Sequence, residues 1–219
     1  MSKAITKAVV LISGRGSNLQ SIIDAIHDNK LSLEVCAVIS NVCDAYGLQR
    51  AKSANIDTVC IENRNYSDRD SYDQALRTTI DQYEPDLLIL AGFMRILTPK
   101  FVQFYQGRIL NIHPSLLPKY QGLNTHKKVL ASHDCQHGAS VHFVTEDLDA
   151  GPIIIQAKVP VLENDTVNTL SERVLQQEHK IYPIALQWFA QKRLKLVNNT
   201  VYLDDIPLNS PVDYSDCIN

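Results

Sequence analysis

The chain has 219 residues, of which 45% are hydrophobic and 21% charged, a balance typical of a globular protein that buries a full core. Its formal net charge of −3 lacks the basic excess with which proteins track nucleic acid phosphates. No apolar run approaches the roughly 20 residues of a membrane-spanning helix, and the run near the N-terminus is too short for a secretion signal. We therefore expect a cytoplasmic protein that binds neither nucleic acid nor membrane.

The cysteines show no pattern of a disulfide framework or a metal site. Their number is odd, they form no C-x-x-C pair, and they are scattered along the chain at Cys36, Cys43, Cys60, Cys135 and Cys217. Disulfide-rich domains and cysteine metal sites show paired, regular spacings instead. We therefore expect reduced thiols, as in the cytosol, and no metal ion.

In the first half of the chain, apolar runs alternate with stretches that have helical spacing. Strands are predicted over 8–12, 33–40, 57–62 and 86–92. Helices are predicted over 46–55, over 67–83 and over a segment that carries Leu19, Ile22, Ile23 and Ile26. Such alternation predicts an α/β, Rossmann-like fold in which helices cover both faces of a mostly parallel sheet.

The second half changes character near residue 105. The stretch "RILNIHPSLLPKYQG" predicts a strand and a proline-rich loop, and residues 138–161 predict an antiparallel hairpin with an acidic turn. One long helix is predicted over 166–191, with a kink at Pro183. The last roughly 25 residues predict a short surface hairpin and a loose tail. We expect a single domain over residues 1–219.

The loop "SGRGSNLQ" after the first strand is a candidate anion site. Gly14 and Gly16 allow backbone N–H groups to approach an anion, and Ser17 with Gln20 has the spacing of a capping box. The dinucleotide fingerprint would require glycine or alanine at Leu19, and the Walker pattern is absent. The loop therefore favours a monophosphate, and a tight turn without a ligand is the alternative.

Three polar residues of the second half form a candidate catalytic group. Asn111 and His113 are two apart on a predicted strand, so both side chains emerge on one face near its C-terminal end. Asp149 lies in the acidic turn, beside Gly151, and meets His113 if that turn folds over the strand end. The alternatives are a satisfied polar contact at the strand end and a solvated acidic turn.

Two charged residues lie inside apolar patterns. Glu178 falls within the apolar stripe of the long helix, which is formed by Leu170, Val174, Ile181, Ala185 and Trp188. A carboxylate that faces inward requires a partner, which is either a ligand or a core arginine or backbone donor. Arg95 within "FMRIL" suggests a pocket wall, although the same run also fits a core.

The sequence resembles the phosphoribosylglycinamide formyltransferase family, the folate-dependent enzymes of purine synthesis. The resemblance spans nearly the whole chain and rests on "SGRGSNLQ", "PDLLILAGFMRIL", "LNIHPSLLPKYQGLNTH", "HGASVHFVTEDLDAGPII" and "QEHKIYP". It implies formyl transfer from 10-formyltetrahydrofolate, as co-substrate, to the amine of N1-(5-phospho-D-ribosyl)glycinamide. It also implies the formyltransferase fold, small-molecule substrates, no metal, and a monomer or homodimer.

The resemblance assigns site residues one by one. The catalytic asparagine, histidine and aspartate correspond to Asn111, His113 and Asp149. The phosphate loop corresponds to Gly16, Ser17 and Asn18, and Glu178 corresponds to the residue that binds the ribose hydroxyls. The folate pocket corresponds to Arg69, Met94, Arg95, Ile96, Leu97, Asn111, Val144 and Asp149. Residues of about 1–105 would then bind the phosphate, and residues of about 106–200 would carry the catalytic and folate-binding half.

The chain also departs from the family pattern. Arg15 stands where asparagine is common, Gln121 where proline is common, and Asn124 where histidine is common. Methionyl-tRNA formyltransferase and formyltetrahydrofolate deformylase share the formyl-transfer motif, but each carries a further domain that we do not expect here. A catalytically silent nucleotide-binding module is the alternative from another class, and the joint presence of Asn111, His113 and Asp149 argues against it.

Overall fold

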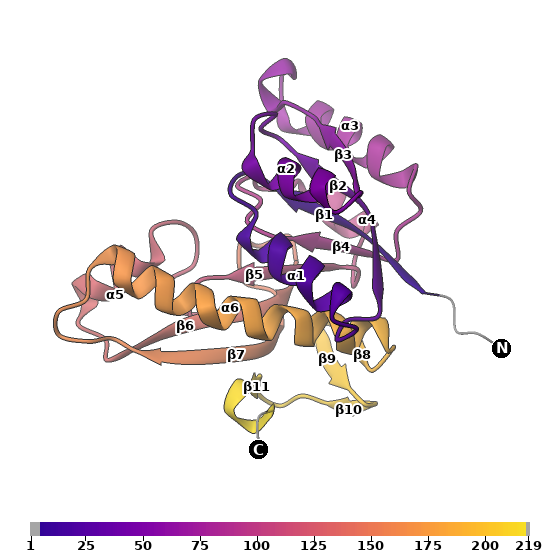
Figure 1. The fold of residues 1–219 in the computed structure, drawn as a ribbon. Helices are drawn as coiled ribbons and strands as arrows, with labels where there is room; N and C mark the ends of the chain where they lie inside the picture. Colours follow the sequence, from indigo (N-terminus) through magenta and orange to yellow (C-terminus); the bar gives the residue numbers. More distant parts are fainter. Residues whose placement is uncertain (1–4, 218–219) are drawn as a thin grey trace. The chain divides into compact units, whose positions relative to one another are not determined.

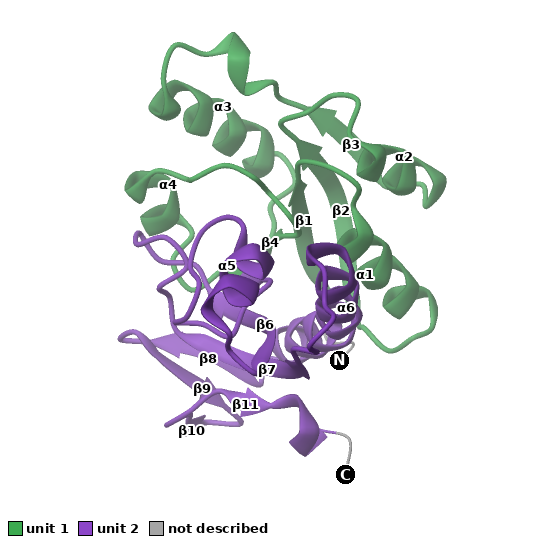
Figure 2. Ribbon diagram, turned by 90° about the vertical axis from the view of Figure 1, so that its left-hand side faces the viewer, with its two compact units in different colours: residues 1–110 green, residues 111–219 purple. Residues whose placement is uncertain are grey.

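The computed structural model describes residues 5–217, and the chain divides into two compact units, Met1–Leu110 and Asn111–Asn219 (Figure 2). We call them the N-terminal and the C-terminal unit. The division lies near the expected change of character at residue 105. The assignment of the whole chain to one domain stays a prediction.

The N-terminal unit contains a parallel sheet in the order β3-β2-β1-β4. Its strands are β1 (Thr6–Ile12), β2 (Leu33–Ser40), β3 (Asp57–Cys60) and β4 (Leu87–Leu90). The strand order reverses between β1 and β4, and open α/β sheets bind ligands at the carboxyl ends of strands at such a point. The loops after β1 and β4 are joined there, because the Ser13 N–H donates to the Gly92 carbonyl at 3.1 Å.

Helices cover both faces of this sheet, as predicted (Figure 2). Helix α1 contacts α2, and α3 contacts α4. The helical segments are α1 (Ser17–His27), α2 (Tyr46–Ser53), the 3-10 turn η1 (Asn63–Asn65), α3 (Arg69–Asp81) and α4 (Pro99–Phe104). Helix α3 begins with a capping box between Asp68 and Ser71. The sequence pattern missed α4, since six residues are too few to show a helical period.

The predicted capping box at the start of α1 is wrong. The N-cap is Gly16, with φ +67°, and no side chain caps the helix. Ser17 is therefore the first helical residue rather than the cap. Glycine adopts a left-handed backbone at little energetic cost, because it has no Cβ. Gly16 can therefore be the N-cap although it has no side chain to cap the helix.

The C-terminal unit is built around the hairpin of β6 (Gln136–Phe143) and β7 (Ile153–Pro160), which is antiparallel as predicted. The sheet order here is β11-β7-β6-β5, with β5 at Ile109–His113 and β11 at Val212–Asp213. Helix α6 (Val167–Ala190) packs along β6 and β7 (Figure 1) and runs through Pro183, where a kink stays a prediction. Helix α5 (Thr125–Ser132), which the sequence pattern missed, precedes β6.

Near the C-terminus, the predicted short hairpin is confirmed, whereas the predicted loose tail is wrong for the described residues. A small antiparallel sheet is formed by β8 (Leu194–Val197), β9 (Thr200–Leu203) and β10 (Ile206–Pro207). Strand β11 then pairs in parallel with β7, and the 3-10 turn η2 (Tyr214–Cys217) follows. An ion pair of 2.5 Å between Lys158 and Asp213 supports this pairing. Strands of two residues are too short to show alternation, so the sequence pattern missed them.

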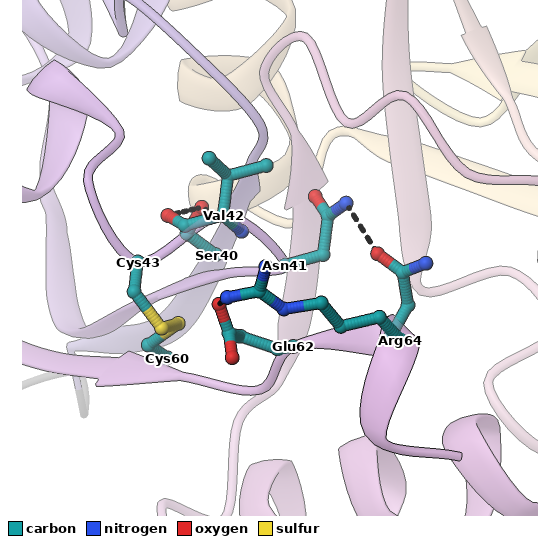
Figure 3. The surroundings of a disulfide bond; sticks show 8 residues. Ser40, Asn41, Val42, Cys43, Cys60, Glu62 and Arg64 are labelled. Carbon is teal, nitrogen blue, oxygen red and sulfur yellow. Dashed lines mark hydrogen bonds and ion pairs between the residues drawn. A yellow bond between two sulfur atoms is a disulfide. The ribbon is translucent and has the colours of Figure 1, made fainter.

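The expectation that all thiols are reduced is also wrong. Cys43 and Cys60 form a disulfide (Figure 3), whereas Cys36, Cys135 and Cys217 are free. The parallel register of β2 and β3 places Ser40 opposite Cys60, and Cys43 follows three residues after Ser40. This proximity depends on strand pairing and is therefore invisible in cysteine spacing. Within the described residues, no helix is both long and apolar enough to cross a membrane.

Candidate active site

The C-terminal end of β5 brings the predicted catalytic residues together. Asn111 and His113 lie two apart on β5, and the turn that follows β6 carries Asp149 to them. His113 Nδ1 lies 3.4 Å from Asp149 Oδ2, and Asn111 Nδ2 lies 3.5 Å from Asp149 Oδ1. His113 is only 6% exposed. The predicted meeting of Asp149 with His113 is therefore confirmed, and it occurs entirely within the C-terminal unit.

The turn that carries Asp149 is held in a defined conformation. Asp149 has a left-handed backbone, with φ +49°, which is uncommon for a residue with a side chain. The Gly122 N–H donates to Asp149 Oδ2 at 2.9 Å, and Gln121 Nε2 donates to the Asp149 carbonyl at 3.1 Å. At Gly151, an added Cβ would lie 1.8 Å from the Phe143 carbonyl oxygen, so only glycine fits. These contacts aim the carboxylate at the strand end.

The second nitrogen of His113 faces the Tyr120 carbonyl. The distance from Nε2 to this oxygen is 3.0 Å, and a carbonyl only accepts, so Nε2 carries a hydrogen. Tyr120 has φ +60°, and its hydroxyl lies 2.6 Å from both Asp134 Oδ2 and Ser132 Oγ. With Asp149 near the other nitrogen, both nitrogens of the ring face acceptor oxygens.

Sequence reasoning missed His142, which is buried on β6 beside the three residues. Its Nδ1 donates to the Phe143 carbonyl at 2.9 Å, so Nε2 accepts a hydrogen from Asn111 Nδ2 at 3.0 Å. Burial lowers the pKa of His142 well below its ordinary value, which keeps the ring neutral and able to accept. His142 thereby orients the Asn111 amide. The available signal was a polar ring inside the apolar run "SVHFV".

The loop "SGRGSNLQ" (residues 13–20), which we call the glycine loop, is a separate feature of the N-terminal unit. A Cβ added at Gly16 would lie 2.6 Å from the Gly47 Cα, so glycine is required there. Ser17 and Asn18 form the first turn of α1, where backbone N–H groups lack helical partners. An anion bound at these groups would also benefit from the helix dipole. The loop therefore stays a candidate phosphate site.

The residues of the expected folate pocket differ in exposure. Met94, with 68% of its surface exposed, and Ile96 face solvent, whereas Leu97 is buried in the core. The Arg95 guanidinium lies 4.7 Å from the centre of the Tyr72 ring, a cation–π contact. Two further residues of the expected pocket also differ in exposure. Arg69 is exposed at the start of α3, and Val144 is half-buried after β6. The N-terminal unit thus presents two large apolar side chains, Met94 and Ile96, to solvent.

Glu178 lies where the helix pattern predicts it. It is only 7% exposed, on the face of α6 that also buries Leu170, Val174 and Ile181. Its role in binding ribose stays a prediction. Among the described residues, no group of three or more histidine, cysteine, aspartate or glutamate side chains is placed to hold a metal ion.

Comparison with known proteins identifies the family. Residues 6–186 match the formyl transferase family. Phosphoribosylglycinamide formyltransferase of Escherichia coli (strain K12) is 55% identical over 196 residues, which cover 90% of this chain and 92% of that protein. The human trifunctional purine biosynthetic protein adenosine-3 is 46% identical over 197 residues, which cover 90% of this chain and 20% of that protein.

A solved structure agrees with these relatives. Phosphoribosylglycinamide formyltransferase from Coxiella burnetii, in complex with CHES, matches with a TM-score of 0.92 and 52% sequence identity. The match covers 96% of this chain and 99% of that chain. Sequence and fold lead to the same conclusion: this chain belongs to the formyl transferase family.

Proposed function

We propose that the chain transfers a formyl group from 10-formyltetrahydrofolate to the amine of N1-(5-phospho-D-ribosyl)glycinamide. The products are the N-formyl ribonucleotide and tetrahydrofolate, in the de novo synthesis of purines. The observation that carries this proposal is the contact of Asp149 with His113 and Asn111 at the end of β5. Close relatives named phosphoribosylglycinamide formyltransferase support the choice of substrates.

The three residues supply what formyl transfer requires. Attack of the amine on the formyl carbon places negative charge on the formyl oxygen, and donors must lie where this charge develops. Protonated His113 would donate from Nδ1, and Asn111 would donate from its amide, because their contacts with Asp149 are long, at 3.4 and 3.5 Å, and hold these two hydrogens only weakly. Asp149, directly or through a water molecule, accepts the proton that the amine loses.

Other side chains would hold the two substrates. The glycine loop at Gly16, Ser17 and Asn18 would bind the phosphate, and Glu178 would accept hydrogen bonds from the ribose hydroxyls. The folate would contact the side chains or backbone of Arg69, Met94, Arg95, Ile96, Leu97, Asn111, Val144 and Asp149. The exposed apolar surface of Met94 and Ile96 supports this part of the proposal, since a flat ligand ring would cover it.

The proposal extends to the setting in which the chain works. The substrates are small molecules, and neither nucleic acid nor membrane takes part. The reaction needs no metal ion, because a neutral amine is itself the nucleophile and the donors are side chains. We place the protein in the cytoplasm, as a monomer or a homodimer.

A two-substrate assay tests the function. The purified chain is incubated with 10-formyltetrahydrofolate and the ribonucleotide, and the absorbance of the deformylated folate is followed. We expect turnover that requires both substrates. Release of formate without the ribonucleotide would indicate a deformylase, and formylation of methionyl-tRNA would indicate the transfer-RNA enzyme. Nucleotide binding without any turnover would indicate a silent binding module.

A further inference from the structure

The disulfide joins two loops at the carboxyl edge of the parallel sheet in the N-terminal unit. Cys60 ends the edge strand β3, and Cys43 lies in the short connection between β2 and α2 (Figure 3). The Cys43 side chain is exposed, so small reagents can reach it. The bond closes a loop with a sequence separation of 17 residues, which contains all of α2.

Helix α2, which begins three residues after Cys43, packs directly on the glycine loop. The Gly47 N–H donates to the Gly14 carbonyl at 3.0 Å. Arg50 Nε donates to the Arg15 carbonyl at 3.0 Å. A Cβ added at Gly16 would lie only 2.6 Å from the Gly47 Cα, so the two backbones are in contact. A shift of the first turn of α2 therefore displaces the candidate phosphate site.

The loops joined by the disulfide also hold the start of the glycine loop through side chains. Asn41 Nδ2 donates to Asn63 Oδ1 at 3.2 Å, which links the connection after β2 to the segment after Cys60. Asn41 Oδ1 accepts from Ser13 Oγ at 2.5 Å, and Ser13 Oγ accepts from the Met94 N–H at 2.8 Å. The network thus runs from the disulfide loops to the residue that precedes Gly14.

We propose that Cys43 and Cys60 form a reversible thiol–disulfide site, whose reagents are low-molecular-weight thiols and disulfides, and whose state sets the affinity of the glycine loop for the substrate phosphate. The phosphate part rests on the proposed function, whereas the redox chemistry does not. In a reducing compartment, protein disulfides are usually transient or redox-sensing. A pair that is accessible and coupled to a ligand loop fits that use.

The chemistry is a balanced exchange of two electrons. The Cys43 thiolate attacks one sulfur of a small disulfide RSSR, and the first RS⁻ leaves as a mixed disulfide forms. The Cys60 thiolate then attacks the Cys43 sulfur and displaces the second RS⁻. The two protein thiol protons end on the two RS⁻ groups, so the products are the protein disulfide and two RSH. Reduction by two small thiols follows the same steps in reverse.

Reduction should weaken ribonucleotide binding through disorder of the loop. Without the bond, the connection between β2 and α2 gains conformational freedom, and the competent loop becomes a fraction of the population. Apparent affinity falls by that fraction, so a competent population of roughly 10–30% would raise the ribonucleotide KM about 3- to 10-fold. We expect kcat to change by less than about twofold, since Asn111, His113 and Asp149 belong to the other unit.

The test equilibrates the full chain in buffers with different ratios of reduced to oxidised glutathione. Thiols are alkylated and counted by mass spectrometry, and the same samples give the ribonucleotide KM and the hydrogen exchange of residues 13–20. We expect the 43–60 bond to form with increasing oxidation, together with a lower KM and slower exchange. Cys43→Ser and Cys60→Ser should keep the higher KM at every ratio. Cys135→Ser, which removes an exposed free thiol, should respond like the unmodified chain.

Two results would overturn the proposal. One is the absence of a 43–60 bond at every ratio of the buffer. The other is a bond that forms while loop exchange and KM stay constant, which would leave the disulfide uncoupled from the loop. If the serine variants fail to fold, the unmodified chain in the buffer series still decides. If the chain transfers no formyl group, the proposed function fails, but thiol counts and loop exchange still test the coupling.

Discussion

At the scale of single residues, His113 depends on the oxygens around it. Asp149 Oδ2 and the Tyr120 carbonyl lie at 3.4 and 3.0 Å from its two ring nitrogens. Replacement Asp149→Asn removes the carboxylate that contacts His113 and that would accept the amine proton. We expect kcat to fall by at least about 10²-fold, the scale of a lost general base, with both KM values largely kept. Steady-state kinetics with each substrate varied in turn measures this.

The control for this variant is a double-mutant cycle with His113→Ala. If His113 and Asp149 act as a unit, the double variant should lose far less activity than the product of the two single losses. Losses that multiply fully would show that the two side chains act independently. Circular dichroism of all three variants excludes unfolding as the cause.

A variant of Tyr120 tests whether the hydrogen bonds of its hydroxyl group keep its carbonyl in place beside His113. Tyr120→Phe keeps the ring but removes the hydroxyl that lies 2.6 Å from Asp134 and from Ser132. The carbonyl that orients His113 then loses its support, and we expect kcat to fall about 3- to 10-fold, equivalent to roughly 1 kcal/mol, with KM unchanged. Asp134→Asn keeps an acceptor for this hydroxyl and should have a smaller effect. A rise in KM without loss of kcat would refute a role through His113.

At the scale of elements, the start of α1 shows how two helices share one loop. Gly16 has a left-handed backbone against Gly47, whereas a Cβ added at Gly14 meets no atom within 4 Å. Gly16→Ala combines a backbone cost of roughly 1 kcal/mol with a clash against Gly47. We expect the ribonucleotide KM to rise at least about tenfold, the effect of 1.4 kcal/mol, with the folate KM unchanged.

Gly14→Ala is the matched control for that prediction. The added methyl group meets no atom of the chain, so the urea midpoint should stay close to that of the unmodified chain. An equal rise of the ribonucleotide KM and the folate KM in Gly16→Ala, with the fold intact, would contradict a phosphate site at this loop. Equal effects of the two alanines would contradict the importance of the contact with Gly47.

At the scale of the whole molecule, buried imidazoles predict how stability depends on pH. Burial, together with the charges of His126 and His113, lowers the pKa of His137 from 6.5 to about 4, and burial lowers that of His142 as well. Between pH 6.5 and about pH 4, each of these two imidazoles is protonated in the unfolded chain but neutral in the folded chain. Stability should therefore be level above about pH 6.5 and fall towards pH 4, by up to roughly 1.4 kcal/mol per pH unit for each imidazole.

Urea unfolding at several pH values between 7.5 and 4.5 measures this slope. His137→Gln should reduce it, whereas His27→Gln should not, because the side chain of His27 is 89% exposed. The Lys158 ion pair lowers the pKa of Asp213 to about 2, so its contribution is lost only as pH falls from 3.8 towards 2. Asp213 therefore titrates below the pH range of 7.5 to 4.5 in which unfolding is measured. A slope that His137→Gln leaves unchanged would refute the assignment.

The sequence by itself determined much of the fold and the centre of the candidate site. β2 occupies Leu33–Ser40, as its largely apolar run predicts, and the antiparallel pairing of β6 with β7 agrees with the prediction of two strands joined by an acidic turn. Asn111 and His113 could be paired because a strand places residues two apart on one face. Such features depend on local periodicity, which each segment carries in its own residues.

Only the tertiary structure decided the rest, because it depends on which distant segments become neighbours. The Cys43–Cys60 bond follows from the register of two parallel strands, and the orientation of Asn111 follows from His142 on another strand. The start of α1 at Gly16 likewise follows from the close packing of α2. Strand pairing and backbone contact bring together groups that are far apart in the sequence. A local pattern of residues cannot predict which of these groups become neighbours.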